Sequence, residues 1–348
     1  MIDVTKQLIG RRATVYEALV KINQLAEHMV LFVVDEDAHL IGTLTDGDIR
    51  RDLVNNCSFE RLVEDIMKRD FRSIPLDDDS MYDLSKFRNE GITLVPVVDR
   101  KGQIAELVNL QISRARLPLH AVLMAGGEGK RLLPLTEKTP KPLLKIGGKH
   151  IIQYNIEHLS RYGIKQITLS ICYLADQIRN AFEDGTQFGL DIDYIEEKKP
   201  LGTIGALSLV NSFSQDTLLV MNSDLLTNFD IEDFYKEFFN QSAAMAMATV
   251  PYKVKIPYGV LETKDDKIIN FQEKPSYVYQ SNAGIYLLRS EFISLIPEGE
   301  KFNATDMMEA LVAKGEKVIS YGLRSYWLDI GRPEEFAKAE EDIRHIHF

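Results

Sequence analysis

The sequence predicts an α/β fold with a mostly parallel sheet, preceded by a smaller α+β part. Two observations support this prediction. From residue 119 onward, short apolar runs alternate with amphipathic helical patterns, as they do where helices join parallel strands. Before that point, one segment of the chain repeats another. We therefore expect one domain at 1–115, made of repeats 1–57 and 58–115, and a second domain at 116–348.

The repeat is clearest where Val33-Val34-Asp35 aligns with Val97-Val98-Asp99. Each copy has the pattern of an apolar strand, a polar turn, a second strand and the start of a helix. A helical pattern of apolar residues precedes each copy, with Val15, Leu19, Ile22 and Leu25 before the first and Met81, Leu84 and Phe87 before the second.

The alternation in the second domain predicts its elements in order. Strands are expected at Leu119–Met124, Gln166–Cys172, Asp191–Ile195 and Thr217–Met221, and helices at Ile151–Tyr162, Leu174–Phe182 and Thr203–Phe213. Ligands of such sheets bind at the carboxyl ends of the strands. A glycine-rich turn follows the first of these strands and Asp224 follows the last, so both should lie at that edge.

Composition excludes several classes of partner. The chain has 348 residues and a formal net charge of −11, which argues against a large nucleic-acid interface. No apolar run reaches the length of a transmembrane helix, and the N-terminus lacks the pattern of a signal peptide. Cys57 and Cys172 show no pairing pattern, as is usual in a reducing compartment. We expect a cytoplasmic protein without membrane or nucleic-acid partners.

The most informative stretch is MAGGEGKRLLPLTEKTPKP at 124–142. Gly126, Gly127 and Gly129 follow the apolar run, and glycine lets the backbone approach a ligand closely. Backbone N–H groups in such a turn form an anion-binding hollow. Arg131 and Lys141 add two cations beside prolines, so the pattern indicates a polyphosphate ligand.

Two common phosphate motifs do not fit this stretch. A P-loop needs a hydroxyl residue after Gly-Lys, but Arg131 follows Gly129-Lys130. A dinucleotide fingerprint needs a third glycine and an immediate helix, but Leu132-Leu133-Pro134 follows. The plain alternative is a charged surface turn.

The same stretch resembles the signature of the sugar-phosphate nucleotidylyltransferases, G-G-x-G-[Thr/Ser]-R-L-x-P-L-T followed by P-K-P. The matching residues are Gly126, Gly127, Gly129, Arg131, Leu132, Pro134, Leu135, Thr136, Pro140, Lys141 and Pro142. Lys130 departs from the usual hydroxyl residue and adds a cation. The resemblance covers roughly residues 118–348 and implies a Rossmann-like, GT-A-like domain.

Two acids are candidate metal ligands. Asp224 ends a buried apolar run, where a carboxylate is costly unless it is compensated. In the resembled family, an aspartate at this place holds Mg²⁺ on the nucleotide, and Asp329 matches a second metal ligand. Two carboxylates together with phosphate oxygens suit Mg²⁺. The alternatives are a helix cap or turn for Asp224 and a plain turn residue for Asp329.

Further downstream, the resemblance implies residues for the nucleoside and the sugar. Residues 196–206 match a family segment in which Gly202 brings backbone toward the nucleoside. The resemblance places Gly259 against the sugar ring, Glu273 on a sugar hydroxyl, Lys274 on the sugar phosphate and Asn282 toward the sugar. Without it, Glu273 and Lys274 would be taken for a solvated ion pair.

These residues together predict the reaction of the family. A hexose 1-phosphate would attack the α-phosphorus of a nucleoside triphosphate and release pyrophosphate, without a covalent protein intermediate. Because two anions must meet, catalysis should depend on positioning and charge neutralisation. Arg131 and Lys141 would neutralise the triphosphate, Lys274 would hold the attacking phosphate, and Asp224 and Asp329 would hold Mg²⁺.

The tandem repeat resembles a pair of CBS modules, which often bind adenine nucleotides as regulators. Thr45 and Asp48, within GTLTDGD at 42–48, match the residues that contact phosphate and ribose in that family. The second copy departs from the pattern, with Asn109 and Ile112 at the equivalent places. The plain alternative is that Thr45 and Asp48 only cap a helix.

The domain order resembles that of the guanylyltransferases that activate glucosamine 1-phosphate for bacterial nonulosonic (legionaminic) acid synthesis. We therefore expect GTP and glucosamine 1-phosphate as substrates. Two alternatives stay open: a mannose-1-phosphate guanylyltransferase, and a thymidylyl- or uridylyltransferase for glucose 1-phosphate. A nucleotide-sensing protein without activity is an alternative of another class. CBS pairs tend to associate face to face, which suggests a homo-oligomer.

Overall fold

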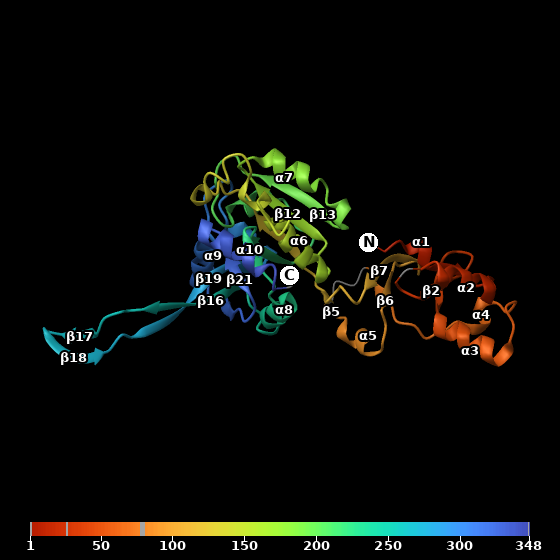
Figure 1. Ribbon diagram of the computed structural model, residues 1–348. Coiled ribbons are helices and arrows are strands. Elements are labelled where there is room, and N and C mark those ends of the chain that lie inside the picture. The colour runs from red at the N-terminus through yellow and green to blue at the C-terminus, as the bar shows by residue number, and fades with distance from the viewer. Residues whose placement is uncertain (1, 26, 77–80, 347) are drawn as a thin grey trace. The chain divides into compact units, whose positions relative to one another are not determined.

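The computed structural model describes residues 2–25, 27–76, 81–346 and 348, which form two compact units (Figure 1). The first unit contains Met1–Leu117 with Arg161–Gly163, and the second contains Pro118–Ser160 and Ile164–Phe348. No helix in these described ranges is both long and apolar enough to cross a membrane.

The first unit contains two similar three-stranded sheets, ordered β1-β2-β3 and β4-β6-β7. In both sheets the first pair of strands is parallel and the second pair is antiparallel. The register shifts at equivalent places, Val33/Val34 and Val97/Val98, so the repeat in sequence is also a repeat in structure. The elements of this unit are α1 (Val4–Gln7), β1 (Leu8–Gly10), α2 (Val15–Asn23), β2 (Val30–Val34), β3 (Leu40–Thr45), α3 (Asp46–Asn56), α4 (Val63–Ile66), β4 (Ile74–Pro75), β5 (Tyr82–Asp83), α5 (Ser85–Asn89), β6 (Leu94–Val98), β7 (Ile104–Asn109) and β8 (Ala115–Arg116).

Capping residues begin the helices of the first repeat. Thr14 accepts a hydrogen bond from the backbone N–H of Glu17, whose side chain accepts one from the N–H of Thr14, and α2 starts there. The same box, made by Thr45 and Asp48, starts α3. The apolar faces of both helices pack on β2 and β3 and close one core.

The second repeat departs from the sequence prediction in both of its helices. The pattern around Met81 gives only the short α5, and residues 77–80 lie outside the described residues. The helix expected after the second strand is wrong. Asn109 accepts a hydrogen bond from the N–H of Gln111 and so forms only a turn, after which the chain runs on to β8.

The second unit is built on a seven-stranded sheet of order β13-β12-β9-β14-β19-β16-β20. Every neighbouring pair is parallel except the two that β19 makes, which confirms the predicted mostly parallel α/β fold. Its strands are β9 (His120–Met124), β12 (Gln166–Ile171), β13 (Asp191–Glu196), β14 (Thr217–Asn222), β16 (Met245–Lys255), β19 (Ser276–Arg289) and β20 (Val318–Gly322). Shorter pairs are β10 (Lys145–Ile146) with β11 (Lys149–His150), β15 (Leu225–Thr227) with β21 (Trp327–Asp329), and β17 (Val260–Lys264) with β18 (Lys267–Gln272).

The helices of the second unit link and cover the strands. They are α6 (Ile151–Arg161), α7 (Ala175–Phe182), α8 (Ile231–Asn240), α9 (Ala304–Ala313) and α10 (Pro333–Asp342), with 3₁₀ turns at Lys130–Leu132, Lys141–Leu143, Thr186–Phe188, Gly205–Leu209 and Ser290–Leu295. α9 supplies Met307 and Leu311 to a core that includes Val122 and Val220 of the two central strands. From β9, the chain adds β12 and β13 on one side and then crosses to β14 on the other. This reversal creates the kind of crevice in which such sheets bind ligands.

One predicted helix of this unit is wrong. Thr203–Phe213 forms only the 3₁₀ turn Gly205–Leu209. The backbone N–H of Ile204 donates to the carbonyl of Phe302 instead of to a helical partner. A Cβ on Gly205 would lie 2.7 Å from the carbonyl oxygen of Glu300, so this segment packs closely against the backbone at Glu300 and does not form the predicted helix. The other predicted strands and helices of this unit are present within one residue or so of their expected ends.

Candidate active site

A cavity of about 760 Å³ opens at the carboxyl edge of the sheet. Met124 ends β9, Cys172 follows β12, Glu197 follows β13 and Asp224 lies just after β14, and all four line this cavity. The volume is in the usual range of ligand-binding pockets. The lining also includes Gly126, Gly127, Glu128, Gly129, Lys130, Arg131, Lys141, Tyr173, Leu174, Lys198, Lys199, Pro200 and Gly202.

The glycine turn forms one wall, and its three glycines differ in what surrounds them. Gly129 has φ +65°, and an added Cβ would lie 2.9 Å from Thr136 Cγ2 and 3.1 Å from Lys141 Cβ. Thr136 fixes this turn by donating its hydroxyl to the carbonyl of Gly129 at 2.9 Å. Gly127 has open space where a Cβ would be, so its backbone is accessible to a ligand in the cavity.

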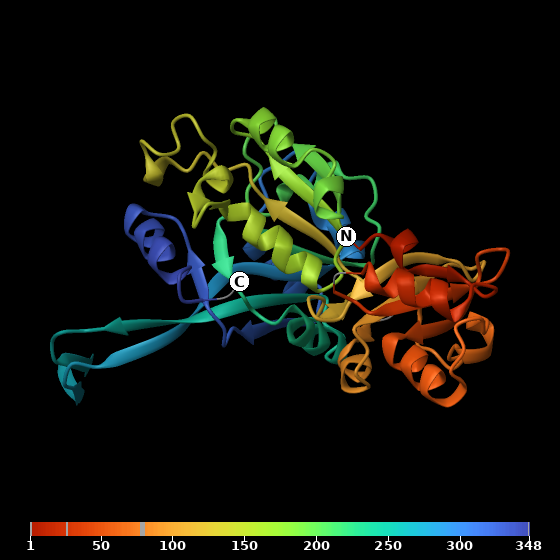
Figure 2. The ribbon, with the colours of Figure 1, turned by 45° about the vertical axis from the view of Figure 1, so that its right-hand side comes forward.

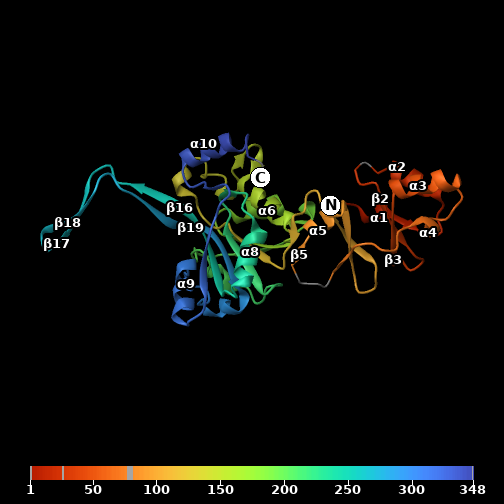
Figure 3. The ribbon, with the colours of Figure 1, turned by 90° about the horizontal axis from the view of Figure 1, so that it is seen from below.

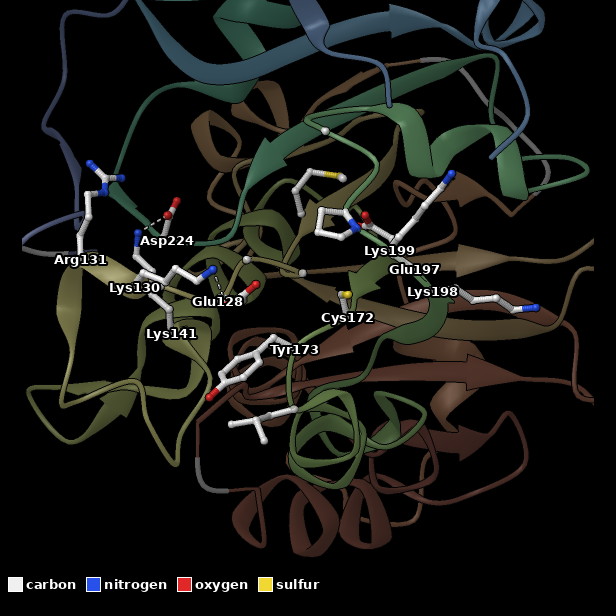
Figure 4. A pocket seen from close by; sticks show the side chains of 17 residues that line it. Glu128, Lys130, Arg131, Lys141, Cys172, Tyr173, Glu197, Lys198, Lys199 and Asp224 are labelled. Carbon is white, nitrogen blue, oxygen red and sulfur yellow. Dashed lines mark hydrogen bonds and ion pairs between the residues drawn. The ribbon is translucent and has the colours of Figure 1, made fainter. Parts of the chain in front are cut away.

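Lys141 connects this wall to the two candidate metal ligands. It lies between Pro140 and Pro142 in a 3₁₀ turn, and it is buried. Its ammonium group forms an ion pair with Asp224 Oδ2 and lies 3.9 Å from Asp329 Oδ1. Figure 4 shows Lys141, Asp224 and Arg131 together on one side of the cavity.

Strand pairing brings the two acids together although they are far apart in the sequence. β15 begins immediately after Asp224, and its first residue, Leu225, is paired with Asp329 of β21. The backbone N–H of Ile330 also donates to the carbonyl of Asp224 at 3.1 Å. Burial, and next the charge of Asp224, raise the pKa of the Asp329 carboxyl above its usual value.

Arg131 completes this charged cluster. A Cβ on Gly331 would lie 3.0 Å from Arg131 Nη2, so the guanidinium group packs directly over Gly331, two residues after Asp329. The structure thus brings together four of the predicted residues, Arg131, Lys141, Asp224 and Asp329.

The acid pair fits a magnesium ion. Asp224 Oδ1 and Asp329 Oδ1 are buried, and neither has a hydrogen-bond partner in the described chain. Buried oxygens without partners are costly, and a hard divalent cation with oxygen ligands would satisfy both. Asp224 and Asp329 are therefore the residues that could hold Mg²⁺, while Lys141 compensates their charge.

The opposite wall contains residues that sequence reasoning missed or only touched on. Glu197 is 6% exposed, and its two oxygens accept hydrogen bonds from Ser170 Oγ at 2.6 Å and from the Leu201 backbone N–H at 2.8 Å. Lys198 and Lys199 follow it, as Figure 4 shows. The signal available in the sequence was a glutamate directly after an alternating strand.

Gly202 and Tyr173 are also part of this cavity. Gly202 has φ +85°, and an added Cβ would lie 2.8 Å from the backbone oxygen of Phe302. Tyr173 donates its hydroxyl to the backbone oxygens of Thr136 and Glu137 and so fastens the signature loop. Loop residues such as Tyr173 have no periodicity, so no sequence pattern predicts this contact.

The residues predicted for the sugar do not lie in the described cavity wall. Gly259, Glu273 and Lys274 lie on a projecting hairpin, where Lys274 Nζ is 3.8 Å from Glu273 Oε1 and both side chains are exposed. Asn282 lies in β19 at the base of that hairpin. Its side chain donates to the Tyr286 hydroxyl and accepts from the Gly284 N–H.

The first unit contains a separate cavity of about 510 Å³, lined by Thr45 together with Phe32, Lys68 and Arg72 among others. Asp48 does not line it; its carboxylate accepts from Thr45 and is paired with Arg51 at 2.6 Å and Lys68 at 3.4 Å. Burial alone would raise the pKa of the Asp48 carboxyl. The hydrogen bonds from Thr45, together with Arg51 and Lys68, outweigh burial and lower the pKa.

Comparison with protein families agrees with this geometry. Residues 120–345 match the family model described as nucleotidyl transferase, well over half of the chain. The chain belongs to this family. Residues 8–55 match the CBS domain model, so a CBS domain precedes the nucleotidyl transferase domain.

Relatives within the nucleotidyl transferase family differ in nucleotide and sugar. The chain is 32% identical over 241 residues to a UTP–glucose-1-phosphate uridylyltransferase from Synechocystis, with 64% of this chain and 62% of the relative covered. It is 31% identical over 229 residues to a mannose-1-phosphate guanylyltransferase from Mycobacterium tuberculosis, with 64% of each covered. The chain thus spans less than two thirds of the length of both relatives.

A solved structure is also similar to this chain. A Bacillus anthracis protein, described as a glucose-1-phosphate thymidylyltransferase and crystallised with sucrose, superposes with a TM-score of 0.54. It is 27% identical, and the match covers 66% of this chain and 97% of that one.

Proposed function

We propose that this chain transfers a nucleotidyl group from a nucleoside triphosphate to a hexose 1-phosphate and releases pyrophosphate. The observation that supports this is the convergence of Arg131, Lys141, Asp224 and Asp329 at one end of a cavity whose wall is an open glycine turn. Family membership is consistent with the same reaction.

The proposed reaction is a displacement at the α-phosphorus of the triphosphate. A phosphate oxygen of the hexose 1-phosphate forms a bond to the α-phosphorus, and the bond from that phosphorus to the bridging oxygen of pyrophosphate breaks. The electron pair leaves with pyrophosphate, so no proton has to move. The glycine turn offers backbone N–H groups to the triphosphate, and Arg131 and Lys141 neutralise charge on the leaving group.

Asp224 and Asp329 would hold a Mg²⁺ ion, which supplies positive charge against the α-phosphate when it is bound. Lys141 faces both carboxylates, and burial, followed by the charge of Asp224, raises the pKa of Asp329. Lys274 is the proposed ligand of the attacking phosphate.

For the nucleotide we propose GTP. Glu197 lines the wall opposite the charged cluster and carries acceptors only. The Watson–Crick edge of guanine presents two adjacent donors, N1–H and N2–H, that a carboxylate can accept together. Uracil and thymine present one N–H between two carbonyl oxygens. A carboxylate repels these carbonyl oxygens. The guanylyltransferase among the relatives is consistent with this choice.

For the sugar we propose glucosamine 1-phosphate, supported by the order of a CBS domain before the transferase domain. Mannose 1-phosphate with GTP is the first alternative, and glucose 1-phosphate with UTP or TTP is the second, as in the relatives. We also propose that the CBS unit binds an adenine nucleotide in the cavity that Thr45 lines.

The test is a pyrophosphate-release assay with Mg²⁺ over four triphosphates and several sugar 1-phosphates. We expect turnover with GTP and glucosamine 1-phosphate, and a loss of about 100-fold or more for Asp224→Asn. Turnover with another pair would keep the reaction and replace the substrates. If the intact chain shows no turnover but still binds AMP or ADP, the chain is a nucleotide-sensing protein without transferase activity.

A further inference from the structure

A two-stranded arm, residues 251–281, projects from the second unit. It comprises the outer parts of β16 and β19 and the hairpin β17–β18 at the tip, and Figures 1, 2 and 3 all show it extending away from the central sheet. Every residue of the arm is described, and none of them is buried. The arm therefore has no core of its own.

Apolar side chains are exposed both at the base of the arm and at its tip. Near the base, the facing pairs Tyr252–Tyr279 and Val254–Tyr277 lie on one side of the ladder, and the other side carries Lys253, Val278 and Lys255. At the tip, Leu261 is paired with Phe271, and strand alternation puts Ile269 on the face of Phe271. The exposed fractions reach 63% for Tyr252 and Ile269.

The opposite face of the tip carries the exposed Ile268 together with polar side chains that are hydrogen-bonded to one another. Glu262 accepts from Asn270 at 3.3 Å and from Gln272 at 3.4 Å. A two-stranded hairpin with one bare apolar face is marginally stable in water unless something covers that face. Several large apolar side chains exposed together in this way are typical of an interaction site.

The connection of the arm to the sheet decides what can cover it. The β16–β19 ladder continues from the core pair Met245–Leu288 outward to Lys255–Ser276, with one irregularity, between Met247 and Thr249. From Asn282 to Ser276 this ladder extends about 20 Å at the usual rise of a strand. Folding the base of the arm back onto the same molecule would break these pairs, so a second molecule is better placed to cover the arm's apolar side chains.

The cavity of the transferase domain lacks the residues predicted for the sugar, and three of these, Gly259, Glu273 and Lys274, lie on the arm. Its described lining residues all fall between Met124 and Asp224, and none comes from the arm. Lys274, with φ +43°, holds a backbone conformation that is unusual for a non-glycine residue, and such strain is typical of functional positions.

A second copy of the chain offers the matching partner, because Leu133 and Leu135 are exposed beside its cavity. The arm also has a formal charge of +1 in a chain whose net charge is −11.

We propose that two copies of this chain exchange their arms, so that each apolar face packs beside the partner's cavity. Glu273 and Lys274 of one copy then complete the sugar-phosphate site of the other. This inference rests on the proposed function for the role of Lys274, and on the arm's geometry alone for the exchange. A symmetric exchange satisfies both arms at once.

The deciding test uses two defective chains with different affinity tags, produced together and purified through both tags. One carries Asp224→Asn and an intact arm, and the other carries Lys274→Ala and an intact pocket. In exchanged dimers, one of the two sites combines the intact pocket with the intact arm, so we expect about half of the wild-type activity. Each variant alone should show only its residual activity.

Doubly tagged protein without activity above that of the single variants would overturn the exchange, as would failure to recover any doubly tagged protein. A second measurement is independent of catalysis. We expect the double substitution Leu261→Lys with Phe271→Lys to halve the mass of the assembly in sedimentation, whereas Val312→Lys, an exposed apolar position on α9, should leave it unchanged. An unchanged mass in the arm variant also contradicts the proposal.

These results separate the two proposals. If wild-type protein shows no pyrophosphate release, the proposed function fails, and the mass of the Leu261/Phe271 variant alone decides the exchange. If wild-type protein is active and the doubly tagged pair is not, the proposed function stands and the exchange fails.

Discussion

The ammonium group of Lys141 forms an ion pair with the carboxylate of Asp224, and it does so where little solvent reaches it. The Lys141 side chain is 9% exposed and that of Asp224 is 24% exposed, with Asp329 close by. A buried charge is tolerated only when it is compensated, so this lysine and the two acids depend on one another. The same dependence is what the proposed binding of Mg²⁺ by the two acids relies on.

We predict that Lys141→Met leaves two carboxylates facing each other and lowers the free energy of unfolding by about 2 kcal/mol, less than for a fully buried pair. The double variant Lys141→Met with Asp224→Asn should recover most of this loss, because it removes one of the unpaired charges. Denaturant unfolding at neutral pH measures both values.

A surface pair provides the control for this prediction. Lys130 lies 2.9 Å from Glu128 with its side chain 74% exposed, so Lys130→Met should change stability by less than about 0.5 kcal/mol. Equal effects of the Lys141 and Lys130 substitutions would contradict the dependence that we describe. So would a double variant that is less stable than Lys141→Met alone.

The glycine turn allows the structural and ligand-binding roles of glycine to be separated. Gly129→Ala forces a side chain into a left-handed position and against Thr136 and Lys141, and we expect a loss of about 1–2 kcal/mol in stability. Gly127→Ala meets open space, so stability should stay unchanged while the Kd for the triphosphate rises. Thermal unfolding and nucleotide titration test the two variants side by side. A normal triphosphate affinity in Gly127→Ala would remove this residue from the binding wall.

Periodicity and glycine placement made most of the second unit predictable. The strands ending at Met124 and Asn222 could be found because buried parallel strands are short apolar runs, and their carboxyl ends fixed one edge of the site. The pairing of Leu225 with Asp329 could not be derived from spacing, because it depends on a tertiary contact between distant segments. For Asp329, only the family resemblance indicated that the residue belongs to the site.

Two other features lay outside what local patterns contain. Thr203–Phe213 has a plausible helical pattern, but hydrogen bonds to the backbone near Phe302 override it. The resemblance named single residues of the arm, but no local pattern predicts the direction in which a hairpin projects. Its direction follows from the continuous β16–β19 ladder, which is a property of the assembled sheet.

Glu197 provides a test of base selection. In Glu197→Gln, the Ser170 hydroxyl can turn to accept from the new amide, while the amide oxygen keeps the Leu201 N–H, so we expect the protein to fold normally. A neutral amide cannot accept both donors of guanine. We therefore predict that the preference for GTP over UTP and TTP falls by about tenfold or more, since a bidentate contact to a base contributes ~1–3 kcal/mol of discrimination. Ratios of kcat/KM measure this preference. An unchanged ratio would mean that other groups select the base.

The capping box of α3 gives a prediction for acid stability. Because the folded pKa of Asp48 is lowered, the charged carboxylate stabilises the fold above its unfolded pKa, and this contribution is lost as the pH falls through the lowered folded value. Thr45→Ala removes a hydrogen-bond partner and should cost about 1 kcal/mol at neutral pH. The difference between Asp48→Asn and wild type should be largest at neutral pH and should shrink on acidification. This stability difference is measured by thermal unfolding of the full chain at a series of pH values from pH 7 downward. A difference that grows as the pH falls would contradict the lowered pKa.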